Sequence, residues 1–393
     1  MTMHDKKVDH ISHGYSRRSA FALFGTGLAT LAATSCAAHA TSSDEHYDSP
    51  LPPDAYELTG SVEGYNTKLI LLGTAAGPLT VPGRSGTATV LMVGDRPYLI
   101  DAGPASSRKL GQAGISAADL GGVFITHMHN DHIADLFNIF WLPGVTLAYK
   151  FTQTVPIFGP GSAGALPIPY QGGSIPIQSP SRPTPGITEM LSGLRDAYAY
   201  EINIRNTEKA AQADFGQYIS AHDILPPPSA GASFDNTAPT MEPFTVFEDD
   251  LVRVTAILVP HGPVFPSYAF RFDTDDGAVT FSGDTAKSDN VIRLAAGTDI
   301  LVHEVVDIDY YARTMKSPAM IEHMVETHTI AADVGRVASA AGAKHVVLSH
   351  IGPGDPREVD DDQWERGVRS TFTGPITVGH DLVQIAVGRR SGP

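Results

Sequence analysis

Cysteine and basic residues are both scarce in this sequence, and each scarcity excludes a class of structure. Only Cys36 among the 393 residues is a cysteine, so the sequence excludes an internal disulfide and a metal site built from several thiolates. Lysine and arginine number 27 against 43 aspartate and glutamate residues, which gives a formal net charge of −16. Because nucleic-acid binding normally requires a basic surface, we expect no nucleic-acid partner.

Glycine and proline, in contrast, are plentiful, with 38 and 29 residues, and they predict many loops. Hydrophobic residues make up 42% and charged residues 18% of the chain, which is typical of a soluble globular protein. Residues 161–243 are rich in proline, glycine and serine, with one helix candidate near 187–199. We interpret 161–243 as an insertion into a larger domain.

The first 40 residues carry the features of an export signal in the right order. Ser16-Arg17-Arg18 is a twin-arginine start, an apolar stretch follows, and Ala38-His39-Ala40 fits a small-x-small cleavage site. We therefore expect a twin-arginine-like signal peptide at 1–40, a flexible lead-in at 41–65, and a periplasmic or secreted protein.

A lipid anchor is the alternative to cleavage after residue 40. Ala33-Thr34-Ser35-Cys36 resembles a weak lipobox, which would make Cys36 the attachment site of a lipoprotein. We expect no transmembrane span in the mature chain.

Strand-like and helix-like segments alternate after residue 66. Apolar, β-branched runs predict strands at 68–72, 89–93, 98–100, 122–126, 251–258, 268–272, 278–281 and 346–348. Helical spacing of apolar residues follows at 133–140 and again at 330–341, where Gly342 can cap the helix. This alternation predicts an α/β fold with layered sheets.

The densest group of polar residues comes directly after the strand expected at 122–126. His127, His129, Asp131 and His132 lie within six residues. Because side chains alternate along a strand, His127 and His129 face the same side, and the following turn brings the other two to a second position. Imidazole nitrogens and carboxylate oxygens suit Zn²⁺, with Mn²⁺ or Fe as alternatives. The sequence therefore predicts a metal site at a strand end.

Three further candidate ligands follow other apolar runs. They are His261, Asp284 and His350, each one to three residues beyond an expected strand. With the first group they provide enough donors for two ions, and Asp284 is the best candidate to bridge them.

The ordered pattern His-x-His-x-Asp-His, a later His, Ser-Gly-Asp-Thr and Leu-Ser-His resembles the metallo-β-lactamase superfamily. Other motifs resemble its ribonuclease Z and arylsulfatase-like branch, over about 66–161 and 250–352. These motifs are Gly73-Thr74 with Gly77-Pro78 and Arg84, a Gly-Pro loop at 155–161, the strand at 267–272, His303-Glu304 and His328-Thr329.

The resemblance implies a four-layer αββα sandwich over 66–393, interrupted by the insertion at 161–243. It implies two divalent metal ions, with zinc favoured by the donor set. One ion would be held by His127, His129 and His261, the other by Asp131, His132 and His350, with Asp284 between them. By the same resemblance Asp131 aims the nucleophile, and His328 is the general acid, oriented by Glu304. We expect His303 to have a structural role.

We therefore expect an exported hydrolase in which a metal-bound hydroxide cleaves a small phosphodiester or sulfate ester. A lactonase or β-lactam-type hydrolase on the same fold is the alternative. A ribonuclease Z-like nuclease is the second alternative, and the sequence disfavours it. In that family a tRNA-gripping arm lies between the third ligand histidine and the bridging aspartate, whereas the interval from His261 to Asp284 has room for two strands and a turn.

Overall fold

The computed structural model describes residues 58–388 and 390, apart from residue 80 and the ranges 145–150, 170–171 and 209–214. The expected signal peptide, the lipid-anchor candidate Cys36 and residues 41–57 of the expected lead-in lie outside the described residues. Within the described part no helix is both long enough and apolar enough to cross a membrane.

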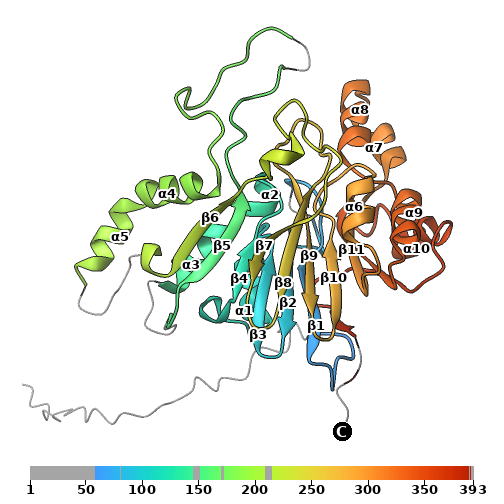
Figure 1. Cartoon of the computed structure of the whole chain (residues 1–393), viewed down its shortest axis with the longest axis horizontal. Coiled ribbons are helices and arrows are strands. Elements are labelled where there is room, and N and C mark those ends of the chain that lie inside the picture. The colour runs from blue at the N-terminus through green and yellow to red at the C-terminus, as the bar shows by residue number, and fades with distance from the viewer. Residues whose placement is uncertain are drawn as a thin grey trace, which may run out of the picture. The chain divides into compact units, whose positions relative to one another are not determined.

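Two mixed sheets of seven strands each form the centre of the molecule (Figure 1). The first sheet has the strand order β14 (Gln384–Val387), β1 (Thr67–Gly73), β2 (Ala88–Val93), β3 (Arg96–Ile100), β4 (Gly122–Phe124), β5 (Val155–Pro160) and β6 (Ile219–Ile224). The second has the order β13 (Ile376–Val378), β12 (His345–Gly352), β11 (Ile300–Val306), β10 (Gly277–Phe281), β9 (Tyr268–Thr274), β8 (Arg253–Leu258) and β7 (Phe244–Glu248).

Aromatic side chains fill the space between the two sheets. The ring of Phe124, from β4, meets the rings of Phe270 and Phe272, from β9, edge-on with centroids 5.9 and 5.0 Å apart. These two β9 residues alternate with others along the strand, so both face the core. All three side chains are fully buried, and edge-to-face aromatic contacts add to the free energy gained by burying their surface.

Helices cover the outer face of each sheet. The first is covered by α1 (Ser106–Gln112), α3 (Leu136–Gly144), α4 (Ile187–Ala197) and α5 (Ala199–Asn206). The second is covered by α6 (Asp289–Leu294), α9 (Ala331–Ala341) and α10 (Asp361–Arg369). Helix α9 buries the face with Val334 and Val337 and ends at Gly342, whose φ of +66° favours glycine. The α/β, four-layer αββα sandwich is confirmed.

One end of the sandwich carries additional elements. Helices α7 (Ile308–Met315) and α8 (Pro318–Thr327), the short helix α2 (Asn130–Ile133) and the segment 162–186 all lie there (Figure 1). The segment has no helix or strand among its described residues. The base of the segment is narrow, because a Cβ atom built on Gly186 would lie 2.9 Å from the Cα atom of Gly161.

The range expected as an insertion, 161–243, also contributes to the sandwich. Its helix candidate corresponds to α4. Its strand β6 pairs in parallel with β5 and completes the first sheet. The β6 sequence Ile-Ser-Ala-His-Asp-Ile carries little β-branched or aromatic character, so it gave no strand signal. The expected Gly-Pro loop at 155–161 is largely strand β5, held by β4 on one side and β6 on the other.

Candidate metal centre

Strand direction brings the predicted ligands to the same end of the sandwich. Strand β8 runs antiparallel to β9, and β9 runs antiparallel to β10, so β8 and β10 share one direction. Strands β11 and β12 are parallel to β10. His261, Asp284 and His350 therefore lie at one edge of the second sheet, and His127 to His132 come from the loop and the helix α2 that follow β4 in the first.

The predicted ligands form two groups that share one residue. His127, His129, His261 and Asp284 offer atoms that all lie within 4.8 Å of one another. Asp131, His132, Asp284 and His350 do the same. These are the groups that the resemblance implied, with Asp284 common to both.

The donor atoms suit a divalent cation. His127 Nε2, His132 Nε2 and Asp284 Oδ1 are buried and have no hydrogen-bond partner within the described part of the chain. The Asp284 carboxylate lies 3.3 Å from His132 Nε2 and 3.2 Å from His350 Nε2. Buried polar atoms of this kind are rarely left unsatisfied, and imidazole and carboxylate donors match zinc and related ions.

The protonation states of His127, His261 and Asp284 suit metal binding, which requires neutral imidazole and ionised carboxylate. Burial lowers the pKa of His261 to about 3 and holds the pKa of His127 well below its usual value. Burial acts in the opposite sense on Asp284, but His350 and His132 outweigh it and lower the pKa of this carboxyl group. Burial also opposes charge on His132, yet Asp284 and Asp101 raise its pKa well above the usual value. His132 is thus the exception, because its surroundings favour the protonated, positively charged imidazole.

Two imidazole rings donate hydrogen bonds from Nδ1, and these bonds hold the rings so that Nε2 faces the site. His261 Nδ1 donates to the carbonyl oxygen of Thr327 at 2.9 Å. His132 Nδ1 donates to Asp101 Oδ2 at 2.8 Å. Such partners fix the tautomer and orientation of a ligand histidine.

Asp101 is a functional residue that the sequence interpretation missed. Its carboxylate also accepts hydrogen bonds from the Thr126 amide, at 2.8 Å, and from the Thr126 hydroxyl. It thereby ties the end of β3 to the start of the histidine run. Asp101 follows the expected strand 98–100 directly, so the strand-end criterion used for the ligands would have found it.

The opening loop between β1 and β2 touches the second group. The Gly77 amide donates to Asp131 Oδ2 at 3.0 Å. Arg84, whose side chain is 1% exposed, donates to Thr74 Oγ1 at 2.9 Å and to the Gly379 carbonyl oxygen. The arginine of this motif therefore holds the loop in place, while the loop backbone contacts the site.

His328 follows α8 and lies beside both groups. Its Nδ1 donates to Glu304 at 3.0 Å, and Glu304 also accepts from the Thr285 amide at 2.8 Å. Burial opposes the charge on His328, but Glu304 raises its pKa to about 9. The ring centroids of His328 and His261 are 5.2 Å apart. His328 can therefore hold a proton next to the candidate ligands. His303 is buried and contacts the Glu304 carbonyl oxygen through Nδ1.

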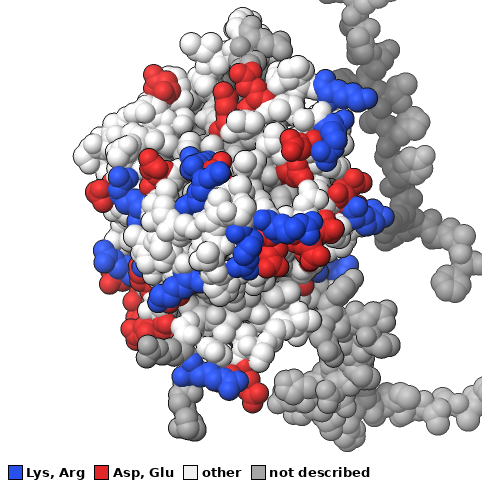
Figure 2. Space-filling model, turned by 90° about the vertical axis from the view of Figure 1, so that its right-hand side faces the viewer, with Lys and Arg blue, Asp and Glu red and all other residues white. Residues whose placement is uncertain are grey.

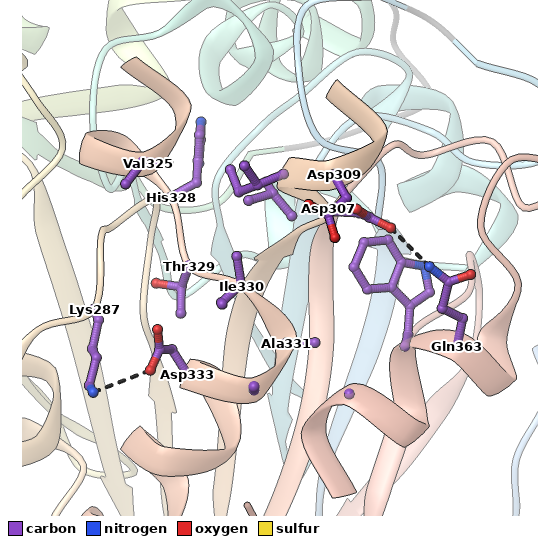
Figure 3. Close-up of a pocket in the computed structure, with 15 residues that line it drawn as sticks. Lys287, Asp307, Asp309, Val325, His328, Thr329, Ile330, Ala331, Asp333 and Gln363 are labelled. Carbon is purple, nitrogen blue, oxygen red and sulfur yellow. Dashed lines mark hydrogen bonds and ion pairs between the residues drawn. The ribbon is translucent and has the colours of Figure 1, made fainter. Parts of the chain in front are cut away.

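A cavity of about 530 Å³ adjoins His328 between α7, α8, α9 and α10 (Figure 3). Three of its charged side chains have partners within the described part of the chain. Lys287 pairs with Asp333 at 3.2 Å, and Gln363 donates to Asp307 at 2.9 Å.

Comparisons with known proteins agree with this geometry. The family model described as "Anti-Pycsar protein Apyc1" matches residues 67–153. Ribonuclease Z from Mycobacterium bovis (strain BCG / Pasteur 1173P2) is 27% identical over 327 residues, which cover 82% of this chain and 99% of the relative. Ribonuclease Z from Mycobacterium marinum is 26% identical with the same coverage.

Two solved structures share the fold. The short form of human tRNase Z gives a TM-score of 0.52 at 20% identity, covering 81% of this chain and 99% of that chain. The metallo-β-lactamase fold protein YhfI from Bacillus subtilis gives a TM-score of 0.52 at 18% identity, with the same coverage.

The expectation of no nucleic-acid partner is wrong as an exclusion, because these relatives are ribonucleases. Net charge is a property of the whole chain. A bound phosphodiester experiences the local electrostatic field of the site, and a metal cation bound there would dominate that field. The charges are also mixed: basic and acidic side chains are interspersed on the face shown in Figure 2.

The shared sandwich, the two ligand groups and the ribonuclease relatives lead to one conclusion. The chain is a metal-dependent hydrolase with the metallo-β-lactamase fold, and its sequence is similar to that of ribonuclease Z.

Proposed function

We propose that this hydrolase is an exported phosphodiesterase that uses two zinc ions. The observation that carries the proposal is the position of Asp284, whose carboxylate belongs to both ligand groups. A shared carboxylate is the arrangement that holds two ions close together. The ribonuclease Z relatives favour a phosphodiester over the sulfate ester that the sequence left equally open.

Divalent ions in these groups would lower the pKa of a water molecule and neutralise charge on the phosphoryl group. The chain supplies the remaining functions. Asp131 is fixed by the Gly77 amide at 3.0 Å and lies 3.3 Å from His350 Nε2, so its carboxylate can orient the attacking water through a hydrogen bond. Burial would raise the pKa of Asp131, but His350 and His132 lower it instead, which keeps it an acceptor.

His328 is placed to complete the reaction. Its Nδ1 is held by Glu304, so Nε2 remains free to donate a proton to the leaving oxygen. A positioned general acid of this type contributes most when the leaving group is a poor one. Glu304 is a positioning residue, since it acts through the imidazole of His328.

The activity is tested by a substrate panel together with metal analysis of the purified mature enzyme. We expect close to two zinc ions per chain and the highest kcat/KM with bis(4-nitrophenyl) phosphate. The comparison set contains 4-nitrophenyl sulfate, an acyl lactone, a β-lactam and a precursor tRNA. Higher efficiency with the sulfate, the lactone or the β-lactam would overturn the phosphodiesterase assignment, and one ion or none would overturn the two-ion site. Cleavage of the tRNA would identify RNA as the phosphodiester.

Export rests on the sequence of residues 1–40 alone. Replacing Arg17 and Arg18 together by lysine should retain the protein in the cytoplasm, because the twin-arginine pair is what such a signal presents for recognition. Cell fractionation with an antibody detects the change. Lys6 and Lys7 replaced by arginine provide a charge-matched control, and unchanged export of the first variant would contradict the proposal.

A further inference from the structure

A second, smaller cavity of about 210 Å³ lies beside the histidine run. Its walls come from four parts of the chain. They are Met128, the loop that follows His261, the base of segment 162–186 and the loop that carries Phe234. Among the residues that line it are Met128, Ala165, Leu166, Phe234 and Val264.

No residue lining this cavity carries a charge. Apart from Thr184 the walls are built from alanine, glycine, proline, valine, leucine, methionine and phenylalanine. Leu166 is 38% exposed, and Met128, Phe234 and Val264 are partly exposed. These apolar surfaces are therefore presented at the surface and are not sealed in the core, so a ligand with apolar faces would bury them.

The cavity and the candidate metal centre share two loops. Met128 stands between His127 and His129 in the chain. The Val264 amide donates to the His261 carbonyl oxygen at 3.1 Å. His129 is the exposed member of its ligand group, so the group is open to solvent beside the cavity. The cavity therefore adjoins the ligand group through Met128 and through the loop that follows His261.

His328 lies on another side of the site. It follows α8 and lines the larger cavity of about 530 Å³, whereas it is not among the residues that line the apolar cavity. A leaving group that takes a proton from His328 would therefore lie toward the larger cavity and away from the apolar one. The other substituent, which stays on phosphorus, would then lie toward the apolar cavity.

We propose that this cavity binds a flat, uncharged ring on the substituent that remains attached to phosphorus after cleavage. The inference rests on the proposed phosphodiesterase function and adds the class of substrate: a diester with an aromatic or nucleobase-like group on its non-leaving side. Its volume suits one ring system, and its proline and phenylalanine side chains offer flat faces for stacking.

The test compares two diesters with the same leaving group, phenyl 4-nitrophenyl phosphate and methyl 4-nitrophenyl phosphate. The wild-type enzyme should favour the phenyl diester by about tenfold or more in kcat/KM, the range expected for one apolar group in a fitted pocket. Ala165→Trp fills the cavity and should bring the ratio to about one. Phe234→Ala removes one wall and should lower the ratio as well.

The control is Ser174→Trp, which adds the same side chain to an exposed position of the same segment outside the cavity. It should retain the wild-type ratio. A wild-type ratio near one, or an Ala165→Trp ratio equal to that of the control, would overturn the assignment of the cavity.

Binding separates this inference from the proposed function. If neither diester is hydrolysed, the phosphodiesterase proposal fails. Saturation-transfer NMR with the phenyl diester then tests the cavity alone. Ring signals should be present with wild-type protein and Ser174→Trp and weak with Ala165→Trp, and equal signals in all three would contradict the proposed site.

Discussion

Asp284→Asn is expected to lower kcat/KM by roughly 10⁴-fold, the size of loss seen when one member of a group that acts as a unit is removed. Asp284 is the residue common to both ligand groups, and it lies within 3.8 Å of the Nε2 atoms of His127 and His261. An amide keeps the shape of the side chain but loses the negative charge that would offset the charge of bound metal ions. Metal content should therefore fall together with activity.

The matched control is Asp273→Asn on strand β9. This aspartate pairs with Arg271 at 2.9 Å, and its side chain is 44% exposed, so exchange of one acidic group for an amide there should leave activity and metal content unchanged. Circular dichroism on both variants reports whether the fold is retained. A folded Asp284→Asn enzyme with two ions and wild-type activity would remove Asp284 from the site.

His328→Ala is expected to have an effect that depends on the leaving group. With an alkyl leaving group, whose oxygen requires a proton, kcat should fall by about 10²- to 10⁴-fold. With 4-nitrophenolate, which leaves without protonation, the loss should be below about tenfold. The measurement is the slope of log kcat against leaving-group pKa, which should become steeper in the variant.

His323→Ala supplies the control for that experiment, because His323 is an exposed histidine on the same helix α8. Glu304→Gln should give an intermediate slope, since it removes the charge next to Nδ1 but keeps a hydrogen-bond acceptor. An equal loss for good and poor leaving groups in His328→Ala would show that His328 does not donate the proton.

The ligand groups were predictable because each residue lies at or shortly after the end of an apolar run, and strand ends in a layered α/β fold meet at one edge. His350 itself lies in the last residues of β12 (His345–Gly352). His261, Asp284 and His350 needed no other signal. The fold class followed from the alternation of strands and helices. Asp101 also follows an apolar strand, but it was missed. Only its contacts with His132 and Thr126, which the sequence does not show, distinguish it from an ordinary loop residue.

Other features depend on tertiary packing and left little trace in the sequence. Strand β6 is short and half polar, and it forms through pairing with β5 at the edge of the first sheet. Helix α7 buries none of its residues, and α8 buries Met324 and Thr327, so packing against the core fixes few of their positions. The expectation of no nucleic-acid partner was wrong because it used the net charge of the whole chain to judge the charge of one local site.

The narrow base between Gly161 and Gly186 has a consequence for how this enzyme could change. A Cβ atom built on Gly186 would lie 2.9 Å from the Cα atom of Gly161, so the chain leaves β5 and enters α4 at nearly one point. Closing a longer or shorter loop there would alter the conformational entropy cost only slowly with length. The wall of the apolar cavity is thus an exchangeable part, and related chains could acquire new substrates by substituting it while the strands that carry the ligands remain as they are.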